Sequence, residues 1–256
     1  MTDDFIVVIP ARYASSRLPG KPLADIAGRT MIEHVWMRAI ESDASRVVIA
    51  TDSEQIERVA SGFGAEVMLT KPDHPNGTSR LAEVAARLQL PAEARIVNVQ
   101  GDEPMLPSAL INLVASRLSA DKQASIATLA ETIDDFDTMM RPSVVKVVRD
   151  VEGRALYFSR APIPWDRDRF TAGSPPAGLG EGWLRHIGIY AYRAGFLAEY
   201  VNWTPAPIEE TEQLEQLRAM YYGHRIQVAT TSLDYPAGVD TPEDLERVRM
   251  LMQGAK

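Results

Sequence analysis

The chain of 256 residues contains no cysteine. This absence excludes a disulfide framework, a thiol nucleophile and a metal site made of thiolates. No run approaches the roughly 20 consecutive apolar residues that a membrane-spanning helix needs. The first residues include Asp3 and Asp4 and lack the apolar stretch of a signal peptide. We therefore expect a cytoplasmic protein that does not insert into a membrane.

Positive charge is also scarce. The chain has 27 Lys and Arg against 35 Asp and Glu, which gives a formal net charge of −8. Nucleic-acid-binding domains normally carry a basic excess, so we expect no nucleic-acid partner. The apolar and charged fractions, 45% and 24%, are those of an ordinary globular protein. The length allows one large domain or two unequal ones.

The cations that are present gather near the N-terminus. An apolar run at residues 5–9 leads into a loop, residues 10–22, that contains Arg12, Arg17 and Lys21. Cations separated by small residues at the carboxyl end of a buried strand predict a site for phosphate groups. The alternative is a basic turn on the surface. The loop is not an ATPase phosphate loop, because Pro22 follows Lys21 where Ser or Thr is required, and it lacks the three glycines of the dinucleotide fingerprint.

Hydrophobic periodicity predicts the fold class. Short β-rich runs predict strands at residues 5–9, 46–51, 66–69, 95–100 and 125–129. Amphipathic segments between them predict helices at 31–41, 54–61, 79–88 and 108–118. Strands that alternate with helices indicate an α/β fold with a doubly wound, mostly parallel sheet.

The pattern changes after Pro142. Strands are predicted at 144–148, 155–158 and 187–192 with few helices between them, and the Pro- and Gly-rich residues 167–182 predict a mobile loop. A helix is then predicted over 208–222 and a strand over 225–229. We interpret residues 1–130 and 206–256 as the α/β domain and residues 131–205 as a small β-rich inserted subdomain that could pack against a second copy.

Two aspartates stand at positions suited to a metal ion. Asp102 follows a predicted strand beside Gly101, where a carboxylate can hold Mg²⁺ at a phosphate site, although it could simply begin a turn before Pro104. Asp240 precedes the last predicted helix and could serve only as its cap. Thr241 can take that capping role and leave Asp240 free to point elsewhere.

Two further segments combine polar groups. Residues 73–80 precede a predicted helix whose N–H groups could meet an anion or a base edge, and a turn with a helix cap is the alternative. We interpret His74 there as local structure. In the later strands, alternation puts His186, Gly188, Tyr190 and Tyr192 on one face, for which plain packing is the alternative. We interpret Tyr192 as core.

The N-terminal string, Ile9-Pro-Ala-Arg-Tyr-Ala-Ser-Ser-Arg-Leu-Pro-Gly-Lys-Pro-Leu23, resembles the signature of the sugar nucleotidyltransferases. The resemblance is closest to the 3-deoxy-manno-octulosonate (Kdo) cytidylyltransferases. Further blocks at residues 73–80, 100–104, 185–193 and 238–245 follow in the order of that family, and similarity extends to about Arg249. One block would be weak, but five in order are specific.

The resemblance implies a fold of the nucleotide-diphospho-sugar transferase or glycosyltransferase-A kind. It implies an enzyme that transfers CMP from CTP to the anomeric hydroxyl of Kdo and releases pyrophosphate, for lipopolysaccharide biosynthesis. It also implies Mg²⁺ as cofactor and a homodimer through the inserted strands. Residues 1–130 and 206–256 would then bind the nucleotide, and residues 131–205 would bind the sugar and the second copy.

The same resemblance assigns site residues. The catalytic group would be Arg17, Lys21, Asp102 and Asp240, with the two aspartates on the metal. The nucleotide would meet Pro10, Ala11, Arg12, Arg17, Lys21, Asp73, Asn76, Gly77, Thr78, Arg80 and Gln100. The sugar would meet Gln100, Arg160, His186, Tyr190 and Glu212, since Arg suits a carboxylate and His, Tyr and Gln suit hydroxyls.

The chain departs from the family pattern at two positions. Asn76 stands where Ser is usual, and Ser79 stands where an acid is usual, which affects the expected cytosine selectivity. An amino analogue of Kdo or a sialic acid is the alternative sugar. A nucleotide-binding protein without catalysis is the alternative function.

Overall fold

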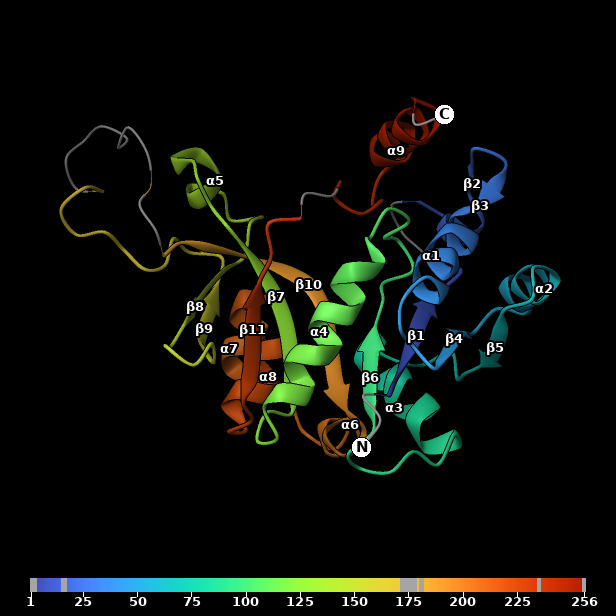
Figure 1. Cartoon of the computed structure of the whole chain (residues 1–256), viewed down its shortest axis with the longest axis horizontal. Helices are drawn as coiled ribbons and strands as arrows, with labels where there is room; N and C mark the ends of the chain where they lie inside the picture. The colour runs from blue at the N-terminus through green and yellow to red at the C-terminus, as the bar shows by residue number, and fades with distance from the viewer. Residues whose placement is uncertain (1–3, 15–17, 171–178, 180–181, 234–235, 255–256) are drawn as a thin grey trace. The chain divides into compact units, whose positions relative to one another are not determined.

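The computed structural model describes residues 4–14, 18–170, 179, 182–233 and 236–254 (Figure 1). Arg17 and most of the loop predicted at 167–182 lie outside these residues. Internal contacts divide the chain into two compact units. The first comprises residues 1–116, 191–202 and 234–256, and the second comprises residues 117–190 and 203–233. These boundaries differ from the predicted 131 and 205, and the assignment of nucleotide and sugar roles to the two parts stays a prediction.

The first unit is built on parallel strands. Its elements are β1 (Phe5–Ala11), η1 (Lys21–Leu23), β2 (Asp25–Ile26), β3 (Arg29–Thr30), α1 (Met31–Ile40), β4 (Arg46–Thr51), α2 (Glu54–Gly62), β5 (Glu66–Leu69), α3 (Gly77–Arg87), β6 (Arg95–Asn98), most of α4 (Ser108–Ala120), α6 (Ala194–Tyr200) and α9 (Pro242–Gly254). The strand order is β6-β1-β4-β5, and β10 neighbours β6. All three pairings among β6, β1, β4 and β5 are parallel.

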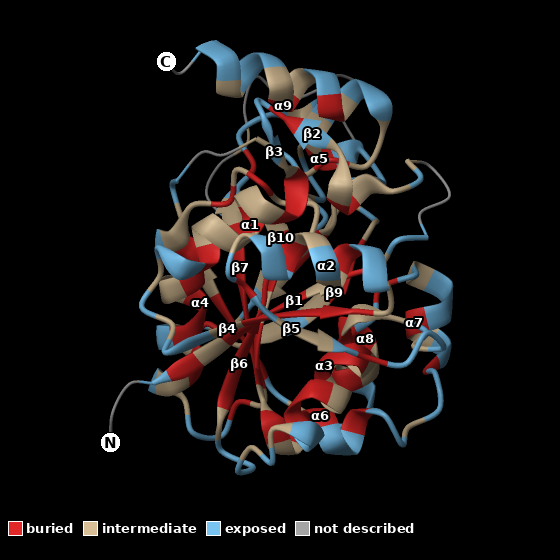
Figure 2. Cartoon of the chain, turned by 90° about the vertical axis from the view of Figure 1, so that its right-hand side faces the viewer, coloured by how far each residue is buried: buried red, intermediate tan, exposed pale blue. Residues whose placement is uncertain are grey.

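The order of these strands creates a switch point. The chain moves outward from β1 to β4 and β5, and then returns through α3 to β6 on the other side of β1. Right-handed crossovers therefore put α1 and α2 on one face of the sheet and α3 on the opposite face. Val7 and Ile9 of β1 are fully buried. Figure 2 colours the central strands of this sheet mainly red, as buried. In such sheets, ligands bind outside the carboxyl ends of the strands where the order reverses.

The second unit is mixed and rich in strands. It contains β7 (Ile126–Thr132), α5 (Phe136–Met140), β8 (Lys146–Arg149), β9 (Ala155–Ser159), most of β10 (Leu184–Arg193), α7 (Pro207–Glu212), α8 (Gln216–Tyr221) and β11 (Ile226–Thr230). β11 runs parallel to β7, β7 neighbours β10, and β8 and β9 continue antiparallel from β10. None of the helices in the described part of the chain is long and apolar enough to cross a bilayer.

The predicted α/β class with a mostly parallel sheet is confirmed, and the inserted subdomain stays a prediction. One element was predicted wrongly, because the helix expected over 208–222 is two helices. Gln213 adopts a left-handed backbone with φ 53°, which ends α7, and α8 starts three residues later. The short helices α5 and α6 were not predicted.

Candidate active site

The ends of β1 and β6 lie against each other at the switch point. A Cβ on Gly101 would come within 2.8 Å of the Pro10 carbonyl oxygen, which is closer than real Cβ atoms approach. Only glycine allows this contact, so Gly101 lets the residues after β6 pass directly over the end of β1. A Cβ on Gly77 would lie 3.6 Å from Pro10 Cγ, which brings the start of α3 to the same place. Pro10, Ala11, Gly77 and Asp102, all predicted site residues, thus belong to one cluster of strand and helix ends.

Lys21 joins this cluster from the cationic loop. Gly20 has a positive φ of 68° and precedes the short η1 turn, which has Pro22 in its first positions. The Lys21 Nζ donates to Asp102 Oδ2 at 2.7 Å, to the Val239 carbonyl at 2.9 Å and to Asp240 Oδ1 at 3.2 Å. Lys21 therefore contacts both aspartates with which it was predicted to act, although they lie 81 and 219 positions away in the sequence.

Asp240 faces Lys21, and its neighbour Thr241 takes the role of helix cap. The Thr241 hydroxyl oxygen accepts from the Asp244 N–H at 3.2 Å, and Asp244 Oδ2 accepts from the Thr241 N–H at 3.0 Å. This reciprocal pair is a capping box at the start of α9. The predicted role of Thr241 as cap is confirmed.

Packing fixes the segment that carries Asp240. The Val239 N–H donates to the Asp102 carbonyl at 2.8 Å, and a Cβ on Gly238 would lie 3.0 Å from the same oxygen. The Val239 side chain is fully buried in a cluster with Ile26, Met31, Leu245 and Val248. The backbones of Asp102 and Asp240 are therefore held in register by a direct hydrogen bond and a shared core.

The two carboxylates offer a set of oxygen donors for a cation. The Asp102 and Asp240 side chains are 31% and 47% exposed, whereas Lys21 between them is 14% exposed. The largely buried ammonium of Lys21 already lies between their oxygens, which shows that the pair accommodates positive charge. Mg²⁺ uses one or two carboxylates together with phosphate and water, so this donor set fits it. Among the described residues, no cluster of three or more acids or histidines adds a further ligand.

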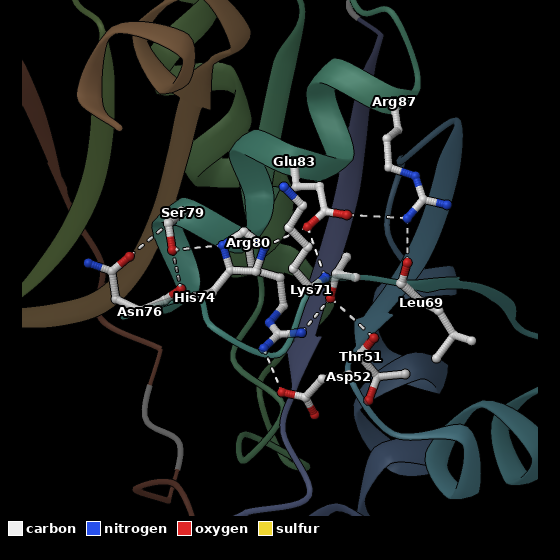
Figure 3. A network of polar contacts seen from close by, with 11 residues as sticks. Thr51, Asp52, Leu69, Lys71, His74, Asn76, Ser79, Arg80, Glu83 and Arg87 are labelled. Carbon is white, nitrogen blue, oxygen red and sulfur yellow. Dashed lines mark hydrogen bonds and ion pairs between the residues drawn. The ribbon is translucent and has the colours of Figure 1, made fainter. Parts of the chain in front are cut away.

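The turn at residues 73–80 is held by its own side chains (Figure 3). Asn76 caps α3, because its Oδ1 accepts from the Ser79 N–H at 2.9 Å. Ser79 Oγ donates to the Asn76 carbonyl at 2.9 Å and lies 3.2 Å from His74 Nδ1. The other ring nitrogen of His74 lies 2.6 Å from Glu83 Oε2. His74 is therefore local structure, as predicted.

Glu83 at the end of this chain is held in its charged form. Burial raises the pKa of its carboxyl, but hydrogen bonds from the Lys71 N–H, His74 and Arg87 outweigh that effect and lower the pKa below its usual range. The Ser79 hydroxyl takes part in a network that ends on this charge. The acid usual at position 79 in the family would add a second negative charge here.

Arg80, which was predicted as a nucleotide contact, is engaged with protein partners in the structure. Its side chain is fully buried, pairs with Asp52 Oδ2 at 2.8 Å and donates to the Thr70 hydroxyl (Figure 3). The buried guanidinium binds two protein partners, and it thereby links the start of α3 to the residues that follow β4 and β5. No local pattern indicated this pairing, since arginine is rarely buried.

The second unit brings together two of the residues predicted for the sugar. The Glu212 carboxylate accepts from the Arg160 N–H at 2.9 Å and from the Ser159 hydroxyl at 2.5 Å. The guanidinium of Arg160 donates to the carbonyls of Glu212, Pro142 and Gln213. Five N–H donors are available on a guanidinium, so two remain for a carboxylate after these three bonds.

Lys146 supports Arg160 from inside. Its side chain is fully buried, and its Nζ donates to the carbonyls of Arg141, Val144 and Arg160 at 2.9, 2.6 and 2.5 Å. Burial lowers the pKa of this ammonium below its usual value. Sequence reasoning missed Lys146, although a lone lysine inside the apolar run Val144-Val-Lys-Val-Val148 was a visible signal.

Two further predicted sugar residues, His186 and Tyr190, lie on β10. The rings of His186 and Tyr190 are 5.4 Å apart, and Phe158 of β9 packs edge-on against His186 at 5.0 Å. Gly188 between them is exposed, and a Cβ there would meet nothing within 4 Å. Packing therefore does not require glycine at this position, and the face is open between the two rings. Tyr192 on the same strand is only 5% exposed and belongs to the core, as predicted.

The sequence and the structure were compared with those of known proteins, and the similarities agree with the site described above. Residues 6–226 match the family model described as cytidylyltransferase. The chain therefore belongs to the cytidylyltransferase family.

Individual relatives show which kind of cytidylyltransferase the chain resembles. A 3-deoxy-manno-octulosonate cytidylyltransferase from Chromohalobacter salexigens is 65% identical over 97% of this chain and 96% of its own length. The enzyme of the same name from Pseudomonas syringae pv. syringae is 58% identical over 99% and 100%. A solved structure of a CMP:2-keto-3-deoxy-manno-octonic acid synthetase in complex with CTP is 40% identical, covers 99% of both chains and has a TM-score of 0.88. Within its family, the chain thus stands among the 3-deoxy-manno-octulosonate cytidylyltransferases.

Proposed function

We infer that the protein transfers CMP from CTP to the anomeric hydroxyl of Kdo and releases pyrophosphate. The product, CMP-Kdo, is the activated sugar for bacterial lipopolysaccharide. The observation that carries this inference, beside the full-length similarity to enzymes of this name, is the convergence of Lys21, Asp102 and Asp240 at the switch point of the sheet. CTP is a cytoplasmic nucleotide, so the reaction belongs in that compartment.

The nucleotide site is proposed for the ends of β1 and β6 and the start of α3. Arg12 and Lys21 offer cations for the phosphates, and the backbone at Pro10, Gly77 and Thr78 offers close approach to the nucleoside. Asn76 would act through its cap of α3, since its Oδ1 is engaged there. Asp73 is exposed in the turn and could accept from the base or the ribose. Arg17 lies outside the described residues, and its predicted role at the triphosphate is part of this proposal.

Asp102 and Asp240 would hold Mg²⁺. When bound there, this ion would offset charge on the α-phosphate and lower the pKa of the attacking hydroxyl. Lys21 already lies between the two carboxylates and would move its ammonium toward the phosphates when they bind. The protein supplies fixed charge and position, so it needs no covalent nucleophile.

The sugar site is proposed for the second unit, and the sugar contact predicted for Gln100, which lies in the first unit, stays a prediction. Arg160 would bind the carboxylate of Kdo with the two N–H donors that its carbonyl partners leave over. His186 and Tyr190 would meet hydroxyl groups across the open face at Gly188. Glu212 would position Arg160 through the backbone N–H that it accepts.

We further propose a homodimer formed through the second unit. Leu156 on β9 is 60% exposed, Val151 in the turn before it is fully exposed, and β9 pairs with no strand other than β8 among the described residues. Apolar side chains on an open strand edge favour pairing with another chain. Light scattering coupled to size exclusion should give twice the mass of the chain, and a monomeric mass would refute the dimer.

The experiment that tests the function is pyrophosphate release from CTP and Mg²⁺, with and without Kdo. Release only when all three are present is the expected result. Parallel reactions with ATP, UTP and GTP test whether the turn with Asn76 and Ser79 keeps cytosine selectivity. Release with an amino analogue of Kdo or with a sialic acid, and none with Kdo, would reassign the sugar. No release with any pair would favour binding without catalysis.

A further inference from the structure

Thr128 is a polar residue in the core of the second unit. It lies in the middle of β7, between Ala127 and Leu129, and is fully buried. A hydroxyl in such a place destabilises the fold unless it is hydrogen-bonded. Nothing in the reaction described above uses this residue.

The hydroxyl of Thr128 has three polar neighbours, all on β10. Its oxygen lies 2.7 Å from the Ile189 carbonyl, 3.1 Å from the Ile187 carbonyl and 2.9 Å from His186 Nε2. A hydroxyl has one proton and two lone pairs, and carbonyl oxygens only accept. Two oxygens 2.7 Å apart without a proton between them repel, so the Thr128 proton must point to a carbonyl. The lone pairs of Thr128 then face His186 Nε2, which must carry a hydrogen to donate.

This arrangement decides the tautomer of His186. With hydrogen on Nε2 and a neutral ring, Nδ1 has no hydrogen and can only accept. Burial lowers the pKa of His186 to about 3, so the ring is neutral at physiological pH. Nδ1 has no hydrogen-bond partner among the described residues, and His186 as a whole is only half-buried. The edge-on contact with Phe158 further restricts rotation of the ring.

We propose that Thr128 is a positioning residue that fixes His186 as the Nε2–H tautomer, so that Nδ1 reads a hydroxyl group of the acidic sugar. An acceptor at this position excludes a carboxylate and favours an O–H donor. The sugar is thereby oriented, with its carboxylate toward Arg160 and a hydroxyl toward His186. This inference rests on the proposed sugar site and deepens it.

The tautomer can be measured in the protein without substrate. Nitrogen-15 NMR of the histidine-labelled protein separates a protonated from a bare ring nitrogen, and His186→Asn assigns the signals. The expected spectrum shows a protonated Nε2 and a bare Nδ1. Thr128→Val keeps the shape but removes the hydroxyl, and it should give a mixture of tautomers. Thr128→Ser should restore the wild-type spectrum, and Thr132→Val on the exposed end of the same strand is the matched control.

Kinetics then test the role of the tautomer. Thr128→Val should raise KM for Kdo about 10-fold, as expected for one impaired hydrogen bond, and leave KM for CTP unchanged. A wild-type spectrum with hydrogen on Nδ1, or a Thr128→Val spectrum like the wild type, would overturn the proposal. If Thr128→Val loses the Nε2–H tautomer of His186 but keeps its KM for Kdo, the proposed hydrogen bond from a sugar hydroxyl to Nδ1 would be overturned. Failure of the proposed function is distinguishable, because wild-type protein would then release no pyrophosphate whatever the tautomer.

If Thr128→Val does not fold, the wild-type and Thr128→Ser spectra still decide the tautomer. Addition of Kdo to wild-type protein should then shift the Nδ1 signal and leave the Nε2 signal nearly in place. An Nε2 shift larger than the Nδ1 shift would contradict the proposed direction of the hydrogen bond.

Discussion

Asp102 and Asp240 share one ammonium, and this sharing defines what each side chain does. Two carboxylates this close to one point would repel without a cation between them, and Lys21 supplies it at 2.7 and 3.2 Å. Because both carboxylates are partly exposed, the screened ion pairs contribute little to stability, about 1 kcal/mol or less each. Their position at the proposed phosphate site is an arrangement that stability alone does not explain.

Replacement of Asp102 by Asn separates these two effects. The amide keeps the shape but loses the charge, so we expect turnover to fall by about 100-fold or more, while the thermal midpoint changes little. The measurement is pyrophosphate release beside thermal unfolding. Asp43→Asn, an exposed aspartate elsewhere in the same unit, should change neither. Normal turnover by the Asp102 variant would remove this residue from the metal site.

His186 makes stability depend on pH in a known direction. Burial lowers its pKa from 6.5 to about 3. At a pH between these two values, His186 is protonated in the unfolded chain and neutral in the folded chain. The free energy of unfolding is unaffected above the unfolded pKa and decreases as the pH falls below it. At about pH 5 the expected loss is about 2 kcal/mol. Urea unfolding of wild type and His186→Asn at about pH 7.5 and 5 should show a smaller decrease in the variant, and parallel decreases would contradict the assigned shift.

Among the elements, the joint between β1 and β6 determines where Asp102 lies. Gly101→Ala would force a Cβ to within 2.8 Å of the Pro10 carbonyl, so one of the two strands must shift. We expect a loss of about 1–3 kcal/mol in unfolding free energy and a lower kcat with it. Gly62→Ala at the end of α2, where a Cβ meets nothing within 4 Å, should instead raise stability by up to about 1 kcal/mol. Equal effects of the two variants would show that the close contact is unimportant.

Elements with strong local signals were predicted from the sequence, and those set by long-range contacts were not. β4 and β5 have the predicted bounds, because each is an apolar run between turn residues. The capping box at Thr241 was readable for the same local reason. The break at Gln213 was not, since Gln is a good helix former and its left-handed backbone exposes carbonyls that Arg160, 53 positions away, binds.

The site residues likewise divide into those with a local sequence signal and those defined by long-range contacts. Cations, carboxylates and glycines at strand ends indicated Lys21, Asp102 and Asp240 as one site. Buried partners gave no local signal, because Arg80 and Lys146 belong to residue types that are usually exposed. Thr128 is equally inconspicuous in the run Ile126-Ala-Thr-Leu-Ala130, since its three neighbours come from a strand nearly 60 residues later.

At the scale of the whole molecule, the two sets of site residues belong to different units. Lys21, Asp102 and Asp240 lie in the first unit, and Arg160, His186, Tyr190 and Glu212 lie in the second. Each substrate should therefore order its own part of the chain, because binding protects the backbone amides that it stabilises.

Hydrogen exchange measured by mass spectrometry tests this separation. CTP with Mg²⁺ should slow exchange in peptides covering residues 18–24, 73–80, 100–104 and 238–244 and leave those covering 159–160, 184–190 and 212–213 largely unchanged. Kdo alone should give the opposite pattern. Asp102→Asn should weaken the first pattern and keep the second, since Asp102 belongs to the first unit and the residues proposed for Kdo at 159–160, 184–190 and 212–213 belong to the second. Protection by CTP confined to the second unit would refute the placement of the nucleotide, because no proposed phosphate contact lies there.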